Sequence, residues 1–341
     1  MLAPLLDHLA ESEEALALAR DGGDAFCSSA LRPFLVAALL AQSADRPGIV
    51  VAPDDRAAHE LAGDLSAWLA PRQVRFYPSR GVTYESHLTP PPHLVGLRIA
   101  ALDALLEADG SAGAPILVVS APALSEKVPD PSLRPHSFAL AVGDLLDLDE
   151  CAQTLADMGY ERVGQVEERG QFAMRGGLLD VFGATAERAI RVELLDIEIE
   201  SLRSFSTFTQ RSLERVDRIE IAPAAELALE HRPLLPAETS DGERPDIAEL
   251  LPFDRFQPLL ELAGPETTLI VCASEEISPT LRDHWADVCA AFHDDDAHQL
   301  YVPPEELERV LAGRALVRLS SLAGSAPRPV VCGRAGWRRR W

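Results

Sequence analysis

Arginines and glycines flank two short runs of strand-forming residues in RGQFAMRGGLLDVFG, residues 169–183. An arginine on a strand either pairs with a neighbouring carboxylate or is presented to a partner, for which charge-assisted hydrogen bonds are the strong type. Gly176 and Gly177 directly follow Arg175 and predict a tight turn between the two strands, because glycine tolerates turn conformations that other residues avoid. Asp180 belongs to the second of these strands.

A second candidate lies in IRVELLDIEIESLRSF, residues 190–205, which reads as a β-hairpin. Residues two apart on a strand share a face, so Arg191, Glu193 and Leu195 point the same way. A large apolar side chain beside a cation fits a protein-binding patch, because interface cores favour arginine and large apolar groups. The alternative is that Arg191 pairs with Glu193 or Glu200 and that Leu195 is half covered.

Nucleotide chemistry has no clear place in the chain. A phosphate loop of the form GxxxxGK[ST] is expected before the first strand–helix unit, where DGGDAFCSSALRPFLVAALL has Gly22 and Gly23 but no lysine. The only lysine is Lys127. We therefore expect no nucleotide cofactor and no ATP hydrolysis by this chain alone. Measurable turnover that is abolished by mutating residues 22–29 would revive the alternative of a nucleotide hydrolase.

Other catalytic patterns are equally weak. HDDDAH, residues 293–298, places two histidines around three aspartates, but no third converging group can be named, so a solvated acidic loop is the preferred interpretation. There is no GxSxG element, and the five cysteines are scattered without CxxC spacing. We expect no catalytic residue and no metal ligand.

The charge balance limits the partners. The 341 residues include 54 Asp and Glu against 31 Lys and Arg. Phosphate neutralisation needs a basic face, so DNA contact is expected to be weak or indirect. The N-terminus lacks a secretory pattern, and the longest apolar run, residues 34–41, is about half of a membrane span of ~20 residues. A cytoplasmic protein without membrane contact is expected.

Hydrophobic periodicity predicts an α/β fold. Buried strands are expected at 48–52, 116–120 and 268–272, alternating with amphipathic helices, which indicates a parallel sheet covered by helices. Ser278 and Pro279 predict the first residues of a helix. Between the two parts of this pattern lie short strand candidates of a small α+β domain. We expect an α/β domain in two parts, 1–125 and 209–325, an inserted domain at 126–208, and a disordered tail at 326–341.

The inserted segment resembles a known family. The run over residues 170–212, GQFAMRGGLLDVFGATAERAIRVELLDIEIESLRSFSTFTQRS, resembles the UvrB-homology module shared by the transcription-repair coupling factor (Mfd) and the excision-repair protein UvrB. The matching motifs are RGG-L-L-D-V-F, EIES-L-R and the TQRS turn. FYPSRGVTYESHLTP and LYVPPEELE resemble flanking segments of the same family, and the resemblance covers about residues 10–325.

The resemblance implies a fold and a partner. It implies a degenerate helicase-like P-loop fold interrupted by a small domain that docks the damage-recognition ATPase UvrA. Family positions that contact UvrA fall on Arg175, Arg191 and Leu195, while Gly176, Gly177 and Asp180 shape the turn and strands. Leu195 stands where an aromatic residue is usual.

The resemblance also implies a limit. The polymerase-binding and translocase domains of a full coupling factor are not expected in this chain, so RNA polymerase is not an expected partner. The predicted function is a non-catalytic interaction module of transcription-coupled nucleotide excision repair that binds UvrA. The alternative is a nucleic-acid-binding helicase-like fragment with weak or no ATPase activity.

Overall fold

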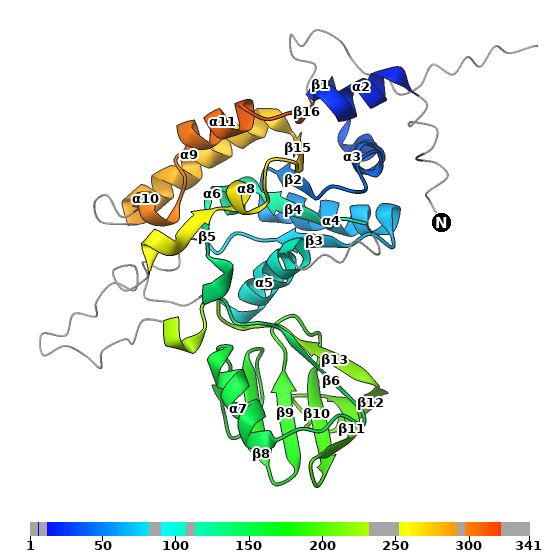
Figure 1. Ribbon diagram of the computed structural model, residues 1–341, viewed down its shortest axis with the longest axis vertical. Helices are drawn as coiled ribbons and strands as arrows, with labels where there is room; N and C mark the ends of the chain where they lie inside the picture. Colours follow the sequence, from blue (N-terminus) through cyan, green and yellow to red (C-terminus); the bar gives the residue numbers. More distant parts are fainter. Residues whose placement is uncertain are drawn as a thin grey trace, which may run out of the picture.

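The computed structural model describes residue 6 and residues 12–81, 90–106, 113–231, 252–291 and 297–321. Figure 1 shows a helix-covered sheet at one end of the molecule and a second sheet with its own helix at the other. The predicted disordered tail at 326–341 lies outside the described residues.

The first domain contains a parallel sheet. Within the described residues its strand order is β1-β16-β15-β2-β4-β3. The strands are β1 Gly23–Phe26, β2 Gly48–Ala52, β3 Val74–Tyr77, β4 Ile116–Ser120, β15 Thr268–Cys272 and β16 Leu316–Ser320. Strands from the end of the sequence lie between β1 and β2, so the two sequence parts form one sheet, as predicted.

Strand β2 shows why helices cover both faces of this sheet. Val50 and Ala52 pack into one buried cluster, whereas Ile49 and Val51 pack into another. Successive side chains of a strand point to opposite faces, so a continuous apolar run needs cover on both sides. The first cluster is covered by α2 Glu13–Asp21, α3 Arg32–Ala41 and α4 Asp55–Leu69. The second is covered by α5 Pro92–Leu106, α6 Ala121–Ser125, α8 Leu259–Leu262, α9 Ser274–Ala291 and α11 Pro304–Ala312.

Helix α9 corrects one prediction. It begins at Ser274, four residues before the predicted cap at Ser278, and Pro279 lies inside the helix. In its first turn the carboxylate of Glu275 accepts a hydrogen bond from the backbone N–H of Ser321 at 2.9 Å, which joins the helix to the end of β16. Acidic residues in the first turn also suit the positive end of the helix dipole.

The inserted domain is built on a mostly antiparallel sheet. Its order in the described residues is β12-β11-β10-β9-β8-β7, and only β7 runs parallel to its neighbour. The strands are β7 Glu161–Arg162, β8 Gln171–Arg175, β9 Leu178–Phe182, β10 Ala189–Leu195, β11 Glu198–Phe205 and β12 Ser212–Val216. A separate pair joins β6 Phe138–Ala141 to β13 Arg218–Ile221. Because β12 and β13 follow residue 208, we propose that the inserted domain ends near residue 222.

The two faces of the inserted sheet differ. Helix α7, Leu148–Asp157, packs on the inner face, where Leu155 contacts a cluster that includes Leu179 and Val192. The opposite, outer face carries Asp180 and Arg191, which are register partners on β9 and β10. The periodicity of a half-buried strand therefore places the apolar residues inward and the candidate site residues outward.

A buried ionic cluster joins the inserted domain to the α/β domain. It consists of Arg80, Arg98, Glu126 and Glu226, whose formal charges cancel. Nη1 of Arg80 lies 2.7 Å from Glu226 Oε2. Arg98 lies 2.5 Å from Glu226 through Nε and 2.7 Å from Glu126 through Nη1. Glu126 precedes β6 and Glu226 follows β13, so the cluster ties together the two chain segments that lead into and out of the inserted sheets, beside α5.

Gly96 of α5 makes a further contact between the domains. A Cβ at this position would lie 2.7 Å from the Cβ of Ala184, in the β9–β10 connection. Only glycine lets the helix and this connection approach so closely. The β9–β10 connection therefore lies against α5, and the β8–β9 and β10–β11 turns lie at the opposite, distal end of the sheet (Figure 1).

Gly96→Ala is expected to lower the free energy of unfolding by about 1–3 kcal/mol, because the added methyl group overpacks the contact with Ala184. Gly63→Ala on α4 is the matched control, since a Cβ there meets nothing within 4 Å. Alanine in an open helical position should instead stabilise by about 0.5–1 kcal/mol. Urea unfolding of both variants measures the difference, and equal effects would contradict the contact.

Candidate partner-binding site

The turn between β8 and β9 brings the first candidate residues to the distal end. Gly176 has φ 60°, a left-handed conformation that favours glycine. The carbonyl of Gly177 accepts a hydrogen bond from the Leu194 N–H at 2.9 Å, and a Cβ on Gly177 would lie 3.2 Å from the Leu194 carbonyl oxygen. These glycines therefore let the turn close against β10, and Arg175 lies at the same distal end with only Leu178 of β9 between it and β10.

Arg191 is held mainly inside the domain. Its guanidinium donates to both carboxylate oxygens of Asp180, at 2.7 and 2.8 Å, and lies 4.8 Å from the ring centroid of Phe205. The side chain is 19% exposed. The hydrogen bond to Asp180 raises the pKa of Arg191. Arg191 therefore pairs with a carboxylate, as the alternative interpretation of the sequence expected, but its partner is Asp180 rather than Glu193 or Glu200.

Arg175 has a different environment. Its side chain is exposed, and its Nη2 donates to the backbone carbonyl of Gly164. No carboxylate of the described residues lies within salt-bridge distance of it. A cation bound only to a backbone carbonyl keeps donors for an acidic partner, because a guanidinium has five N–H groups.

Leu195 ends β10 and is 69% exposed. The next residue, Asp196, has φ 60° and starts the turn to β11. Leu178 begins β9 opposite Glu193 of β10 and is the register partner of Arg175. Arg191, Glu193 and Leu195 alternate along β10 and so share the outer face. Arg175 lies on the same face of β8, so the outer face carries the three predicted site residues Arg175, Arg191 and Leu195, and Arg175 and Leu195 lie at its distal end.

The sequence did not reveal the contacts that support this face. Glu193 lies 3.6 Å from the Nε of Arg203 on β11, and the register shifts between Glu193 and Leu194. The side chain of Gln210, in the TQRS turn, donates to the carbonyl of Thr207 at 2.6 Å. Cross-strand register is the missing signal, because a bulge changes which residues oppose one another.

The segment where a phosphate loop would be expected, residues 22–32, is closed on itself. The carbonyl of Ser28 accepts hydrogen bonds from the N–H groups of Leu31 and Arg32, both at 3.1 Å. Gly22 serves strand contact, because a Cβ there would lie 2.8 Å from the backbone of Leu316. In this conformation the two amides at the start of α3 are used internally rather than presented to an anion.

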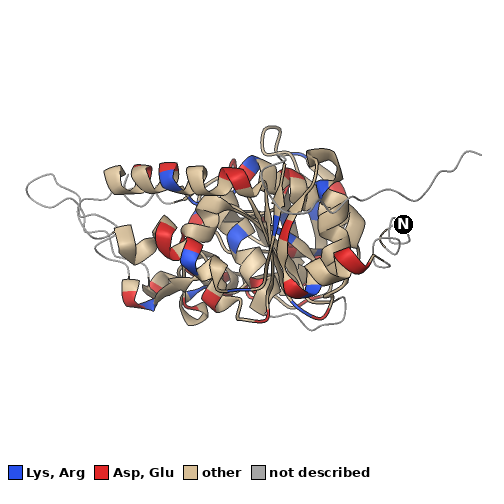
Figure 2. Ribbon diagram, turned by 90° about the horizontal axis from the view of Figure 1, so that it is seen from above, with Lys and Arg blue, Asp and Glu red and all other residues tan. Residues whose placement is uncertain are grey.

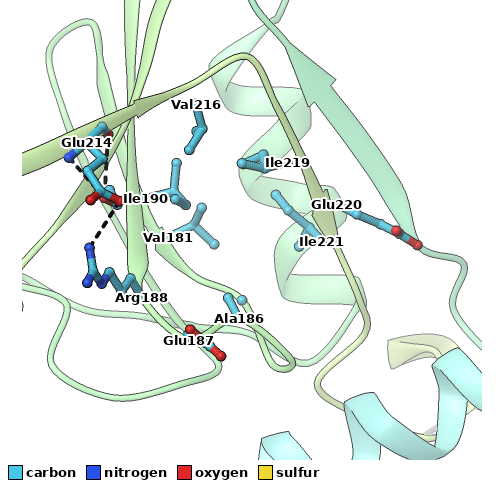
Figure 3. A pocket seen from close by; sticks show the side chains of 12 residues that line it. Val181, Ala186, Glu187, Arg188, Ile190, Glu214, Val216, Ile219, Glu220 and Ile221 are labelled. Carbon is cyan, nitrogen blue, oxygen red and sulfur yellow. Dashed lines mark hydrogen bonds and ion pairs between the residues drawn. The ribbon is translucent and has the colours of Figure 1, made fainter. Parts of the chain in front are cut away.

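A groove opens in the inserted domain, and its lining includes none of the predicted site residues Arg175, Arg191 and Leu195 (Figure 3). Its volume is ≈ 420 Å³, and its floor contains Val181, Ile190 and Ile221. At the rim, Arg188 lies 3.4 Å from Glu214. Figure 3 shows the apolar side chains turned into the groove and this ion pair beside it. The lining carries no arrangement of polar groups that defines a ligand.

Charged residues of both signs are spread over the α/β domain. In the view of Figure 2, acidic and basic residues are interspersed over its helices. No group of three or more potential metal ligands occurs among the described residues, and the HDDDAH segment lies outside them except for Ala297 and His298. No helix in the described part of the chain has the length and apolarity to cross a membrane.

Comparison with known proteins defines the inserted domain. Residues 138–227 match the model of the UvrB interaction domain. The chain is 30% identical over 191 residues to the transcription-repair-coupling factor of Bacillus subtilis (strain 168), covering 56% of this chain and 16% of that protein. It is 34% identical over 170 residues to the protein of the same name from Staphylococcus aureus (strain USA300), covering 50% of this chain and 14% of that protein.

The outer face described above therefore belongs to a UvrB interaction domain. About half of this chain is homologous to the N-terminal region of transcription-repair-coupling factors, and the matched part spans about one sixth of the length of those proteins.

Proposed function

We propose that this chain is a non-catalytic interaction module of transcription-coupled nucleotide excision repair and that it docks UvrA. The observation that carries the proposal is that Arg175 and Leu195 are both exposed on the distal outer face of a UvrB interaction domain. One is an exposed cation without a carboxylate partner in the described residues, and the other is 69% exposed. Both are therefore ready to contact a partner.

Arg191 has a positioning role in this proposal. Its bidentate bond to Asp180 occupies two donors, so it fixes β9 against β10 under the contact surface. The partner contact then depends on Arg175 for charge and on Leu195 for apolar burial. A partner of UvrA acts in the cytoplasm, where excision repair takes place on DNA, so we propose this location for the chain.

Calorimetric titration of UvrA from the same genome with this chain tests the proposal. Arg175→Glu is expected to weaken binding at least about tenfold, roughly 1.4 kcal/mol, because charge reversal turns attraction into repulsion. Arg282→Glu, at an exposed position of α9, is the matched control and should bind like the wild type. Equal affinity of the wild type and Arg175→Glu would contradict the site, and no binding by the wild type would contradict the function.

A further inference from the structure

The register of the inserted sheet aligns exposed side chains across its distal end. Arg175 of β8 is the partner of Leu178 on β9, and Leu195 of β10 is the partner of Glu198 on β11. Leu178 pairs with Glu193, two residues before Leu195 on the same face of β10. Paired residues of antiparallel strands share a face, so these side chains lie on one face in two adjacent rows, Arg175, Leu178 and Glu193 in the first and Leu195 and Glu198 in the second. Diagonal neighbours such as Leu178 and Leu195 are still within reach of long side chains.

The row of Leu195 and Glu198 continues onto a segment that follows β6. Leu145 forms an isolated antiparallel bridge with Glu198. Hydrogen bonds flank the bridge, from the Leu146 N–H to the Ile197 carbonyl at 2.7 Å and from the Ile199 N–H to the Asp144 carbonyl at 2.9 Å. This is the non-hydrogen-bonded type of pair, in which opposite side chains lie closest. Leu145 therefore stands beside Glu198 as Leu195 does on the other side.

We define the distal ridge as Arg175, Leu178, Leu195, Glu198 and Leu145. Its leucines are exposed: Leu145 by 72%, Leu195 by 69% and Leu178 by 37%. Single exposed leucines are ordinary on a protein surface, but an aligned group marks an interaction site. The Leu145–Glu198 bridge and the two turns hold the backbone of these residues in place, so the backbone loses little conformational entropy on binding.

Charge selects the occupant of the ridge. Arg175 stands at one end, without a carboxylate partner in the described residues. Glu198 stands between two leucines near the other end, and none of the salt bridges of the described residues includes it. A complementary surface has an acidic group facing Arg175, a basic group facing Glu198, and apolar recesses for Leu195 and Leu145.

We propose that the distal ridge is one continuous docking edge for a UvrA surface of this chemistry, with Leu145 as its far anchor and Glu198 as its second charged contact. This inference rests on the proposed function, because UvrA supplies the recesses. It adds Leu145, which lies outside both candidate segments of the sequence, and Glu198, which lies in the predicted hairpin but is not one of the predicted site residues.

The test measures the affinity of UvrA for Leu145→Ala and Glu198→Lys, with Leu213→Ala as control. Leu213 is a 53% exposed leucine of β12, away from the ridge. Both ridge variants are expected to weaken binding about tenfold, as truncation of an interface anchor does, while the control binds like the wild type. Urea unfolding of Leu145→Ala checks that the fold is unchanged.

The outcomes separate the two proposals. If Arg175→Glu weakens binding but Leu145→Ala and Glu198→Lys do not, the ridge inference is overturned and the proposed function stands. If wild-type chain does not bind UvrA, both are overturned. Sedimentation velocity adds a third outcome: self-association of the wild type that Leu145→Ala abolishes, with UvrA affinity unchanged, would make the ridge a contact between copies and overturn the inference.

Discussion

Replacing Arg98 by methionine is expected to lower the free energy of unfolding by about 3–5 kcal/mol, the usual cost of removing one partner from a buried ion pair. Arg98 is 1% exposed and bonds to Glu126, to Glu226 and, at 2.7 Å, to the Pro78 carbonyl. Burial alone disfavours its charged form, but Tyr77, Glu226 and Glu126 outweigh this and raise the pKa of Arg98. Without the guanidinium, two buried carboxylates face one remaining arginine.

Urea unfolding measures this effect. Arg56→Met on α4 is the control, because the side chain of Arg56 is 88% exposed and its bond to Glu60 is an ordinary surface pair that contributes little to stability. A loss below about 1 kcal/mol for Arg98→Met would show that the cluster does not hold the connections of the inserted domain. A large loss would show that the charged cluster stabilises the junction between the inserted domain and the α/β domain.

The second large effect concerns Arg191. Arg191→Ala is expected to lower the free energy of unfolding by about 2–3 kcal/mol, because it leaves the carboxylate of Asp180, which is 7% exposed as a residue, without its bidentate donor. Asp180→Ala should have a similar effect. The double variant should lose less than the sum of the two, since both changes remove one interaction.

Arg175→Ala separates stability from binding. It is expected to change the free energy of unfolding by no more than about 0.5 kcal/mol, because the side chain is exposed. Thermal or urea unfolding of the three single variants provides the comparison. If Arg191→Ala were as stable as the wild type and still lost UvrA binding, Arg191 would be a contact residue and its positioning role would be wrong.

Much of the fold follows from residue patterns. The apolar runs at 48–52, 116–120 and 268–272 form central strands, because only a sheet covered on both faces buries such runs. The hairpin predicted over 190–205 also forms, because apolar residues alternate with polar ones along its strands and one face of each strand is buried. Local patterns are thus enough to predict strands that are buried on both faces, from continuous apolar runs, and strands that are buried on one face, from alternation.

Contacts between distant segments could not be predicted in the same way. The pairing of Arg191 with Asp180 depends on the register of β9 and β10, and sequence distance gives no sign of it. Leu145 lies in VGDLL, a stretch without strand periodicity, and only the bridge to Glu198 brings it to the ridge. The ionic cluster joins Arg80 to Glu226, which are 146 residues apart in the chain.

Hydrogen–deuterium exchange of the chain with and without UvrA locates the docking surface directly. We expect slower exchange in the complex for peptides that cover residues 142–146, 175–178 and 193–198, and no change for the sheet of the α/β domain. Protection confined to residues 22–32 or to the α/β sheet, or no protection at all, would contradict the claim that UvrA docks on the distal outer face of the inserted domain.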